Sequence, residues 1–200
     1  MTALRKTPVA ALISDAAPFV IRAERASDAV AREALLDACF GASRHTRTCQ
    51  RLRDGRLPAE GLGLSALCEG RLVGTVRLWH VSAGGVPALM LGPLAVEVTS
   101  RQLGVGAALM DHALAAATTR GHRAVILLGD ATYYARFGFS DLKTGELSLP
   151  GPFERDRLLG LELCEGGLDG AWGMIAPTGA PLPKTKASRG RKALLVPRVA

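Results

Sequence analysis

The segment that most constrains the fold of this 200-residue chain is residues 91–121. It consists of LGPLAVEVTSRQLGVGAALMDHALAAATTRG, which predicts an apolar strand end, a short turn, a glycine loop and a helix. Apolar residues repeat at helical spacing at Leu103, Ala107, Met110, Leu114 and Ala117. Polar residues fall on the other side of this helix, at Asp111, His112, Thr118 and Thr119. Gly121 stands where a left-handed glycine would end the helix.

The glycine loop at the start of this helix predicts an anion-binding site. The first N–H groups of a helix lack partners, its dipole adds positive charge there, and glycine lets a phosphate approach the backbone. The spacing Gly104-Val105-Gly106 lacks the third glycine of a dinucleotide fingerprint, and no P-loop lysine follows. An ordinary helix start remains an alternative, because Thr99 and Gln102 also fit a capping box that would begin the helix earlier.

Two motifs, in this order, resemble the GNAT superfamily of acyl-CoA-dependent N-acetyltransferases. The R-x-x-G-x-G loop from Arg101 to Gly106, after an L-A-V strand end, resembles the family's pyrophosphate loop. The segment YYARFGF at 133–139 resembles the Tyr-x-x-x-Gly-Phe signature that closes the coenzyme site. The resemblance covers residues 18–140. Within the superfamily, the sequence is similar to a branch of uncharacterised predicted acetyltransferases. It implies the GNAT acyl-CoA N-acyltransferase fold, an α/β structure with a central mixed sheet and a splayed parallel strand pair.

Other segments predict the elements around this unit. Apolar runs between turn signals predict strands at 19–21, 63–68, 72–81, 88–98, 124–128, 146–149 and 158–163. Helices are predicted after Ser27-Asp28 and, in a short form, around the two tyrosines. Pro93 cannot donate to a sheet ladder and so predicts an irregularity, where the resemblance implies the slot for the pantetheine arm. In the arginine-rich stretch 44–53, Arg44, Arg47 and Arg51 share one helical face, which we interpret as solvated, with a wall of the acceptor site as the alternative.

Composition predicts one folded domain between two loose ends. We expect a leader over residues 1–17, the acetyltransferase domain over 18–176, and a proline-rich linker with a basic disordered tail over 177–200. Residues 184–200 hold six lysines and arginines and no acid, which is most of the net charge of +7. The folded body is therefore not expected to bind nucleic acid, and only the tail would attract it.

The remaining composition bears on compartment and partners. The four cysteines are Cys39, Cys49, Cys68 and Cys164, and none forms a Cys-x-x-Cys pair. We therefore expect reduced thiols in a cytoplasmic protein, with no bound metal. No apolar run approaches the roughly 20 residues of a membrane span, so no membrane partner is expected. The sequence is compatible with a homodimer and leaves the oligomeric state open.

The resemblance implies which residues hold acetyl-CoA, the expected co-substrate. Backbone N–H groups of residues 102–107 would bind the pyrophosphate, and residues 94–96 would pair with pantetheine as with a missing strand. An N–H group near Val96 would polarise the thioester carbonyl. The full implied set is Leu94, Ala95, Val96, Arg101, Gln102, Leu103, Gly104, Val105, Gly106, Ala107 and Tyr134.

Two residues are the candidates for acid–base catalysis. Tyr134 lies four residues before Gly138, in the family's tyrosine position, and its phenol can protonate a departing thiolate. Tyr133 would point about 100° away on a helix. Glu97 is the candidate base, although a carboxyl with an ordinary pKa of about 4.3 needs burial or a water relay. His80 is the rival base.

The resulting hypothesis is an acetyl-CoA-dependent N-acetyltransferase that acetylates a primary amine by direct attack in a ternary complex. The acceptor would be a small molecule or a protein amine, and the sequence does not identify it. The alternative is a non-catalytic acyl-CoA-binding sensor or docking module. A nucleic-acid-associated role rests on the tail alone.

Overall fold

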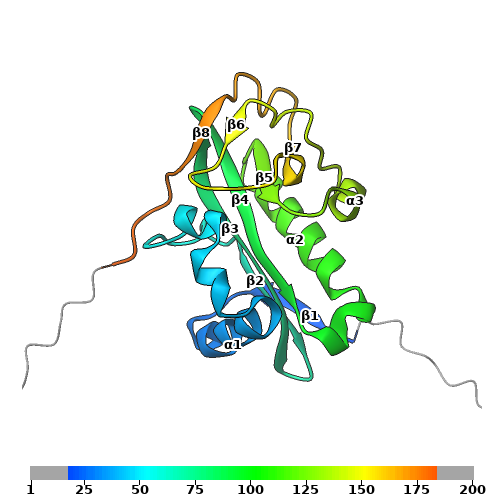
Figure 1. The fold of residues 1–200 in the computed structure, drawn as a ribbon. Helices are drawn as coiled ribbons and strands as arrows, with labels where there is room; N and C mark the ends of the chain where they lie inside the picture. The colour runs from blue at the N-terminus through cyan, green and yellow to red at the C-terminus, as the bar shows by residue number, and fades with distance from the viewer. Residues whose placement is uncertain (1–17, 184–200) are drawn as a thin grey trace, which may run out of the picture.

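The computed structural model describes residues 18–183 (Figure 1). The predicted leader, 1–17, and the basic tail, 184–200, lie outside the described residues, so the expectations for them stay predictions. Within residues 18–183, no helix is long and apolar enough to cross a membrane.

A mixed sheet with the order β1-β2-β3-β4-β5-β7 forms the centre of the molecule. Its strands are β1 (Val20–Ala23), β2 (Gly63–Cys68), β3 (Arg71–Ala83), β4 (Val86–Val96), β5 (Ala124–Leu128) and β7 (Leu158–Glu162). Neighbours along this order are antiparallel, except for the parallel pair β4–β5. The predicted mixed α/β sheet with one parallel step is confirmed.

Two helices cover opposite faces of this sheet (Figure 1). Side chains alternate along a strand, so Leu89 and Leu91 of β4 join the core under α2 (Val105–Thr119), while Met90 joins the core on the other face. Helix α1 (Ala29–Phe40) packs through Leu35 and Leu36 on that other face. The edge of β4 that lies between the two layers is therefore reachable from the side of the molecule.

The apolar face of α2 differs in phase from the predicted one. Met110 and Ala117 are buried, but Leu103 is 44% exposed and Leu114 only half-buried. The residues buried instead are Val105, Leu109 and Ala113. Leu103 is excluded because it lies in a separate 3₁₀ helix, η4 (Val98–Leu103), and α2 begins only at Val105. The end of α2 is as predicted, with Gly121 left-handed at φ 76°.

Three further segments differ from the predictions. The arginine-rich region forms two 3₁₀ helices, η2 (Ala42–Thr46) and η3 (Thr48–Leu52), instead of an α-helix. The short strand β6 (Leu147–Ser148) pairs with β8 (Gly173–Pro177), a strand that the sequence did not predict, and β8 also pairs with β3. Residues 178–182, in the predicted linker, are tied to the domain because Leu57 N–H donates to Ala180 O over 2.8 Å.

Candidate functional site

The site begins where β4 and β5 separate. The two strands pair only at Leu89–Val125 and Met90–Ile126. Within the described residues, the edge of β4 from 91 to 96 therefore has no strand beside it. Gly92 O already accepts a bond from Trp79, and Val96 O accepts bonds from Arg101 and Cys39. The other outward peptide groups of this edge can pair with an extended ligand, as an added strand would.

A bulge in β4 marks the point of separation. The β3–β4 register shifts between Val76 and Leu78, so that Gly92 and Pro93 both lie opposite Arg77. Gly92 has φ 128°, which glycine adopts without strain from a side chain. Trp79 Nε1 donates to Gly92 O over 2.6 Å and fixes the bulge. The irregularity predicted at Pro93 is confirmed.

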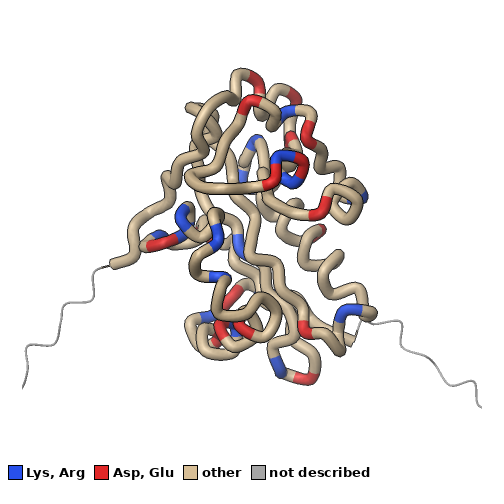
Figure 2. The backbone as a smooth tube through the Cα atoms, in the orientation of Figure 1, with Lys and Arg blue, Asp and Glu red and all other residues tan. Residues whose placement is uncertain are grey.

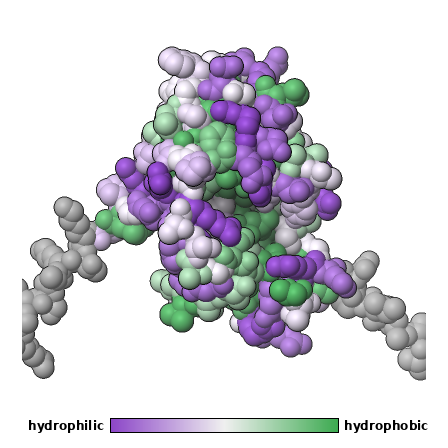
Figure 3. All heavy atoms as spheres, viewed as in Figure 1, coloured by the Kyte–Doolittle hydropathy of each residue, from purple (hydrophilic) through white to green (hydrophobic). Residues whose placement is uncertain are grey.

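Two adjoining cavities follow the free edge. The larger, of about 1070 Å³, lies between residues 91–94 of β4, the end of β5 and the two 3₁₀ helices. The smaller, of about 350 Å³, continues along β4 to the glycine loop. Leu94, Arg101 and Tyr133 line both. Figure 3 shows this face hollowed between polar rims, with apolar residues at the floor.

Most of the predicted coenzyme-binding residues surround these cavities. The lining residues among them are Leu94, Ala95, Val96, Arg101, Gly104, Gly106, Ala107 and Tyr134. Three do not line either cavity: Gln102 and Leu103 are exposed, and the Val105 side chain is buried in the core. Only the backbone of these three residues was predicted to act, so the assignment stays a prediction.

The glycine loop presents unpaired amide groups. Gly104 is left-handed, with φ 76°, and ends η4 just before α2 begins. The first bond within the helix runs from Ala108 N–H to Gly104 O. The N–H groups of Val105, Gly106 and Ala107 therefore precede the helical ladder and carry the positive end of a 15-residue helix dipole. Such a start can hold a phosphate.

A capped turn at the end of β5 positions the two tyrosines. The Asp130 carboxylate accepts from Tyr133 N–H over 2.7 Å and begins α3 (Ala131–Tyr134). The two rings are perpendicular, with centroids 5.0 Å apart. Tyr134 lies against Gly129, where a Cβ would come within 2.2 Å of its ring. The short capped helix predicted from the sequence is confirmed.

Tyr133 lines both cavities and reaches the glycine loop, which the sequence did not indicate. Its hydroxyl lies beside Gly106, because a Cβ built there would be 3.3 Å from the phenol oxygen. Arg136 lies over its ring at 4.8 Å. Two adjacent aromatic residues give no signal of which one faces the glycine loop, so only the structure separates their surroundings.

Burial, with a smaller effect from the neighbouring Tyr133, raises the pKa of Tyr134 to about 12. Desolvation disfavours the phenolate, so the hydroxyl stays protonated throughout the neutral range. In the described part of the chain, no residue forms a hydrogen bond with this hydroxyl. Tyr134 can therefore donate its proton to a ligand in the cavity.

The structure argues against Glu97 as the base. The Arg71 guanidinium donates two hydrogen bonds to this carboxylate, from Nη1 to Oε1 over 2.5 Å and from Nη2 to Oε2 over 2.9 Å. The bond from Arg71, supported by one from the Thr99 hydroxyl, lowers the pKa of Glu97. Glu97 lines neither cavity, and neither does His80, whose ring lies 5.3 Å from His122. The capping box predicted at Thr99 does not form either, since its hydroxyl bonds Glu97.

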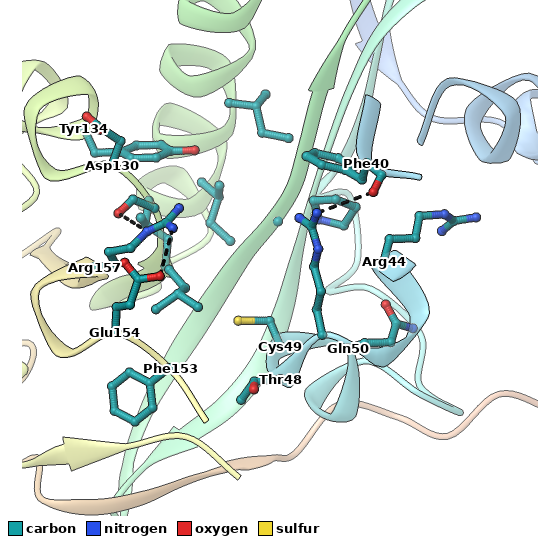
Figure 4. A pocket seen from close by; sticks show the side chains of 18 of the residues that line it. Phe40, Arg44, Thr48, Cys49, Gln50, Asp130, Tyr134, Phe153, Glu154 and Arg157 are labelled. Carbon is teal, nitrogen blue, oxygen red and sulfur yellow. Dashed lines mark hydrogen bonds and ion pairs between the residues drawn. The ribbon is translucent and has the colours of Figure 1, made fainter. Parts of the chain in front are cut away.

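The arginine-rich region forms the wall of the larger cavity opposite Tyr134. Figure 4 shows Arg44, Cys49 and Phe40 on one side, and Tyr134 on the other. Arg44 is not solvated: its side chain is 12% exposed and bonds Asp37 and Glu33. The interpretation of residues 44–53 as a solvated face is therefore wrong for Arg44. Figure 2 shows the basic residues gathered on these turns beside β4.

The cavity also contains two carboxylates that the sequence did not single out. The Asp130 carboxylate already accepts the hydrogen bond that caps α3. Glu154 is largely exposed, and its Oε1 lies 3.6 Å from Arg157 Nη1. Glu154 sits in a loop after a proline pair and carries no motif, so no sequence signal could have found it. In residues 18–183, no cluster of three or more His, Cys, Asp or Glu side chains could hold a metal ion.

Comparison with protein families gives one model match, to an acetyltransferase (GNAT) domain, over residues 60–141. The chain is 31% identical over 161 residues to the uncharacterized N-acetyltransferase YhbS of Escherichia coli K12, covering 78% of this chain and 95% of YhbS. It is also 30% identical over 118 residues to the uncharacterized N-acetyltransferase YjhQ of the same organism, covering 57% of this chain and 65% of YjhQ.

Two solved structures are similar in fold. The crystal structure of the GNAT family N-acetyltransferase YhbS from Escherichia coli, in complex with CoA, has a TM-score of 0.71 at 28% identity. The match covers 82% of this chain and 92% of that one. A GNAT family acetyltransferase from Brucella melitensis, in complex with acetyl-CoA, has a TM-score of 0.54 at 25% identity, covering 73% of this chain and 97% of that one.

Proposed function

Because this chain belongs to the GNAT family of N-acetyltransferases, we propose that it moves the acetyl group of acetyl-CoA to a primary amine by direct attack in a ternary complex. The observation that carries the proposal is the free edge of β4, which connects the glycine loop to the larger cavity. CoA in the structure of YhbS and acetyl-CoA in that of the Brucella relative support the choice of donor.

Backbone groups hold the donor in this proposal. The N–H groups at the start of α2 receive the pyrophosphate, and Arg101, which lines both cavities, adds positive charge. Glu97 N–H bonds Val73 O across the β3–β4 pair. Because alternate residues of a strand turn their polar groups to opposite sides, the peptide groups of Val96 and Leu94 point away from β3 toward the cavities. Apart from Val96 O, which Arg101 and Cys39 already bond, these are the groups that pair with pantetheine.

Besides a held donor, the reaction needs a group that polarises the carbonyl, an acid and a base. The cavity offers a candidate for each of these three. The amine nitrogen attacks the thioester carbon, a backbone N–H near Val96 polarises the carbonyl, and the C–S bond then breaks. Tyr134 gives its phenolic proton to the leaving thiolate. The proton lost by the amine passes through water to Glu154, the cavity carboxylate that makes no cap hydrogen bond.

The experiment that tests the proposal combines a binding and a turnover measurement. Acetyl-CoA should raise the melting temperature by mass action, and a panel of primary amines should release free CoA thiol above the rate of hydrolysis. A sensor or docking module would show the thermal shift with no thiol release from any amine. Absence of both effects would reject the donor site itself.

The dependence of turnover on pH is a further prediction. Because burial raises the pKa of Tyr134 to about 12, the acid form of this group persists until pH approaches that value. We expect kcat/KM to rise with pH as the amine, with an ordinary pKa of about 10.4, loses its proton, and not to fall between pH 8 and 10. A falling limb near pH 9 that disappears in Tyr134→Phe would contradict the raised pKa.

A further inference from the structure

The lining of the larger cavity carries an excess of positive charge. Its basic residues are Arg44, Arg47, Arg53, Arg101 and Arg157, and its acidic residues are Asp130 and Glu154. Two of these arginines have carboxylate partners, since Arg44 bonds Glu33 and Asp37, and Arg157 faces Glu154. The remaining charge is concentrated on the wall formed by η2 and η3.

Arg53 is the most buried of the three lining arginines that have no carboxylate partner in residues 18–183. Its Nε donates to Cys49 O over 3.1 Å, and no carboxylate in residues 18–183 lies within 4.0 Å of its guanidinium. Burial lowers its pKa, an effect that the nearby Asp54 carboxylate partly offsets, although an arginine stays protonated at any working pH. A half-buried cation with no ion-pair partner is costly, and an anion that joins it recovers part of that cost.

The position of this charge relative to the reacting groups is informative. Arg53 Nη1 lies 4.0 Å from the place where a Cβ of Gly92 would be. Gly92 is in the bulge at which β4 leaves β5, so the guanidinium lies at the inner end of the slot. Arg47, on the same wall, donates to Phe40 O over 3.4 Å and lies over the Phe40 ring at 5.2 Å. Arg47 is therefore a second cation on this wall of the cavity.

We propose that the acceptor is a small amine that carries its own anionic group, a carboxylate or a phosphate, and that Arg53, assisted by Arg47, binds this group. A guanidinium pairs such oxyanions through two parallel hydrogen bonds, which fixes orientation as well as position. With the anion on Arg53 at the bulge, the amine of the acceptor extends along β4 toward the thioester. The same charge disfavours cationic acceptors such as polyamines. This inference rests on the proposed function and narrows its substrate class.

Matched acceptor pairs test the inference on the full-length protein. The pairs are 4-aminobutyrate with 4-aminobutanamide, and phosphoethanolamine with ethanolamine, each assayed for kcat/KM by thiol release. We expect the anionic member of at least one pair to be preferred by about tenfold to hundredfold, the range of a hydrogen bond to a charged group. The pair that shows the preference identifies the anion as carboxylate or phosphate.

Variants assign the preference to Arg53. Arg53→Met should abolish it, Arg53→Lys should keep part of it, and both should retain the thermal shift with acetyl-CoA. Arg51→Met is the matched control, because Arg51 lies on η3, the 3₁₀ helix that ends directly before Arg53, and it bonds Pro150 O and does not line the cavity. Equal or greater rates with the neutral amines, or a preference that survives in Arg53→Met, would overturn the inference while acetyl transfer stands. Thiol release from none of these four amines, when other primary amines of the panel are acetylated, would overturn the inference while acetyl transfer stands. Only the absence of thiol release from every amine of the panel would reject the proposed function as well.

Discussion

Tyr134→Phe should lower kcat by about 10²–10⁴-fold, the range typical of a positioned general acid, and leave the affinity for acetyl-CoA nearly unchanged. The substitution keeps the ring that packs against Gly129 and removes only the hydroxyl. That hydroxyl has no hydrogen-bond partner in residues 18–183, so its loss leaves no buried group unpaired and should not destabilise the fold. Steady-state turnover with a working acceptor, or slow acetyl-CoA hydrolysis, measures the effect.

The neighbouring tyrosine supplies the control. Tyr133→Phe removes a hydroxyl that lies beside Gly106, at the glycine loop, so its effect should appear in acetyl-CoA affinity and only weakly in kcat. Wild-type kcat in Tyr134→Phe would remove Tyr134 as the acid. A large loss of kcat confined to Tyr133→Phe would assign the role to the adjacent residue.

Gly104→Glu should abolish the thermal shift produced by acetyl-CoA. A carboxylate at this position would stand beside the unpaired N–H groups at the start of α2 and repel the pyrophosphate. A Cβ here meets no atom within 4 Å, so the side chain itself has room. The positive φ of 76° costs roughly 1–2 kcal/mol for any residue with a Cβ. Each variant must therefore be compared with its own ligand-free melting temperature.

Gly104→Gln separates charge from shape. It has the same backbone cost and nearly the same volume as the glutamate variant, without the negative charge. We expect it to keep a reduced shift with acetyl-CoA. If both variants shift as the wild type does, the glycine loop does not bind the pyrophosphate. Equal loss in both would show that the side chain blocks the site by its volume alone.

The part of the site made by local sequence could be predicted, and the part made by distant contacts could not. The apolar run of β5, the glycine loop before α2, and the cap at Asp130 are each encoded within a few residues. By contrast, the partner of Glu97 is Arg71, 26 residues earlier on the neighbouring strand β3. No pattern around Glu97 could indicate that its charge was already matched.

The wall of the larger cavity formed by η2 and η3 shows a second limit of prediction from the sequence. Helix periodicity placed Arg44, Arg47 and Arg51 on one face, but short 3₁₀ helices turn faster and are interrupted at Arg47. Arg44 consequently meets Glu33 and Asp37 of α1, Arg51 turns to Pro150, and Arg53, outside the predicted face, enters the cavity.

The two sides of the larger cavity have different evolutionary freedom. On the β4 side, the groups offered to a ligand are peptide groups, which most substitutions preserve as long as the strand and its bulge persist. On the η2–η3 side, they are the tips of arginines on short turns that contribute no strand to the sheet. If these arginines bind the acceptor as proposed, a substitution there would change specificity at little cost to folding, and the acceptor could change while the donor site persists.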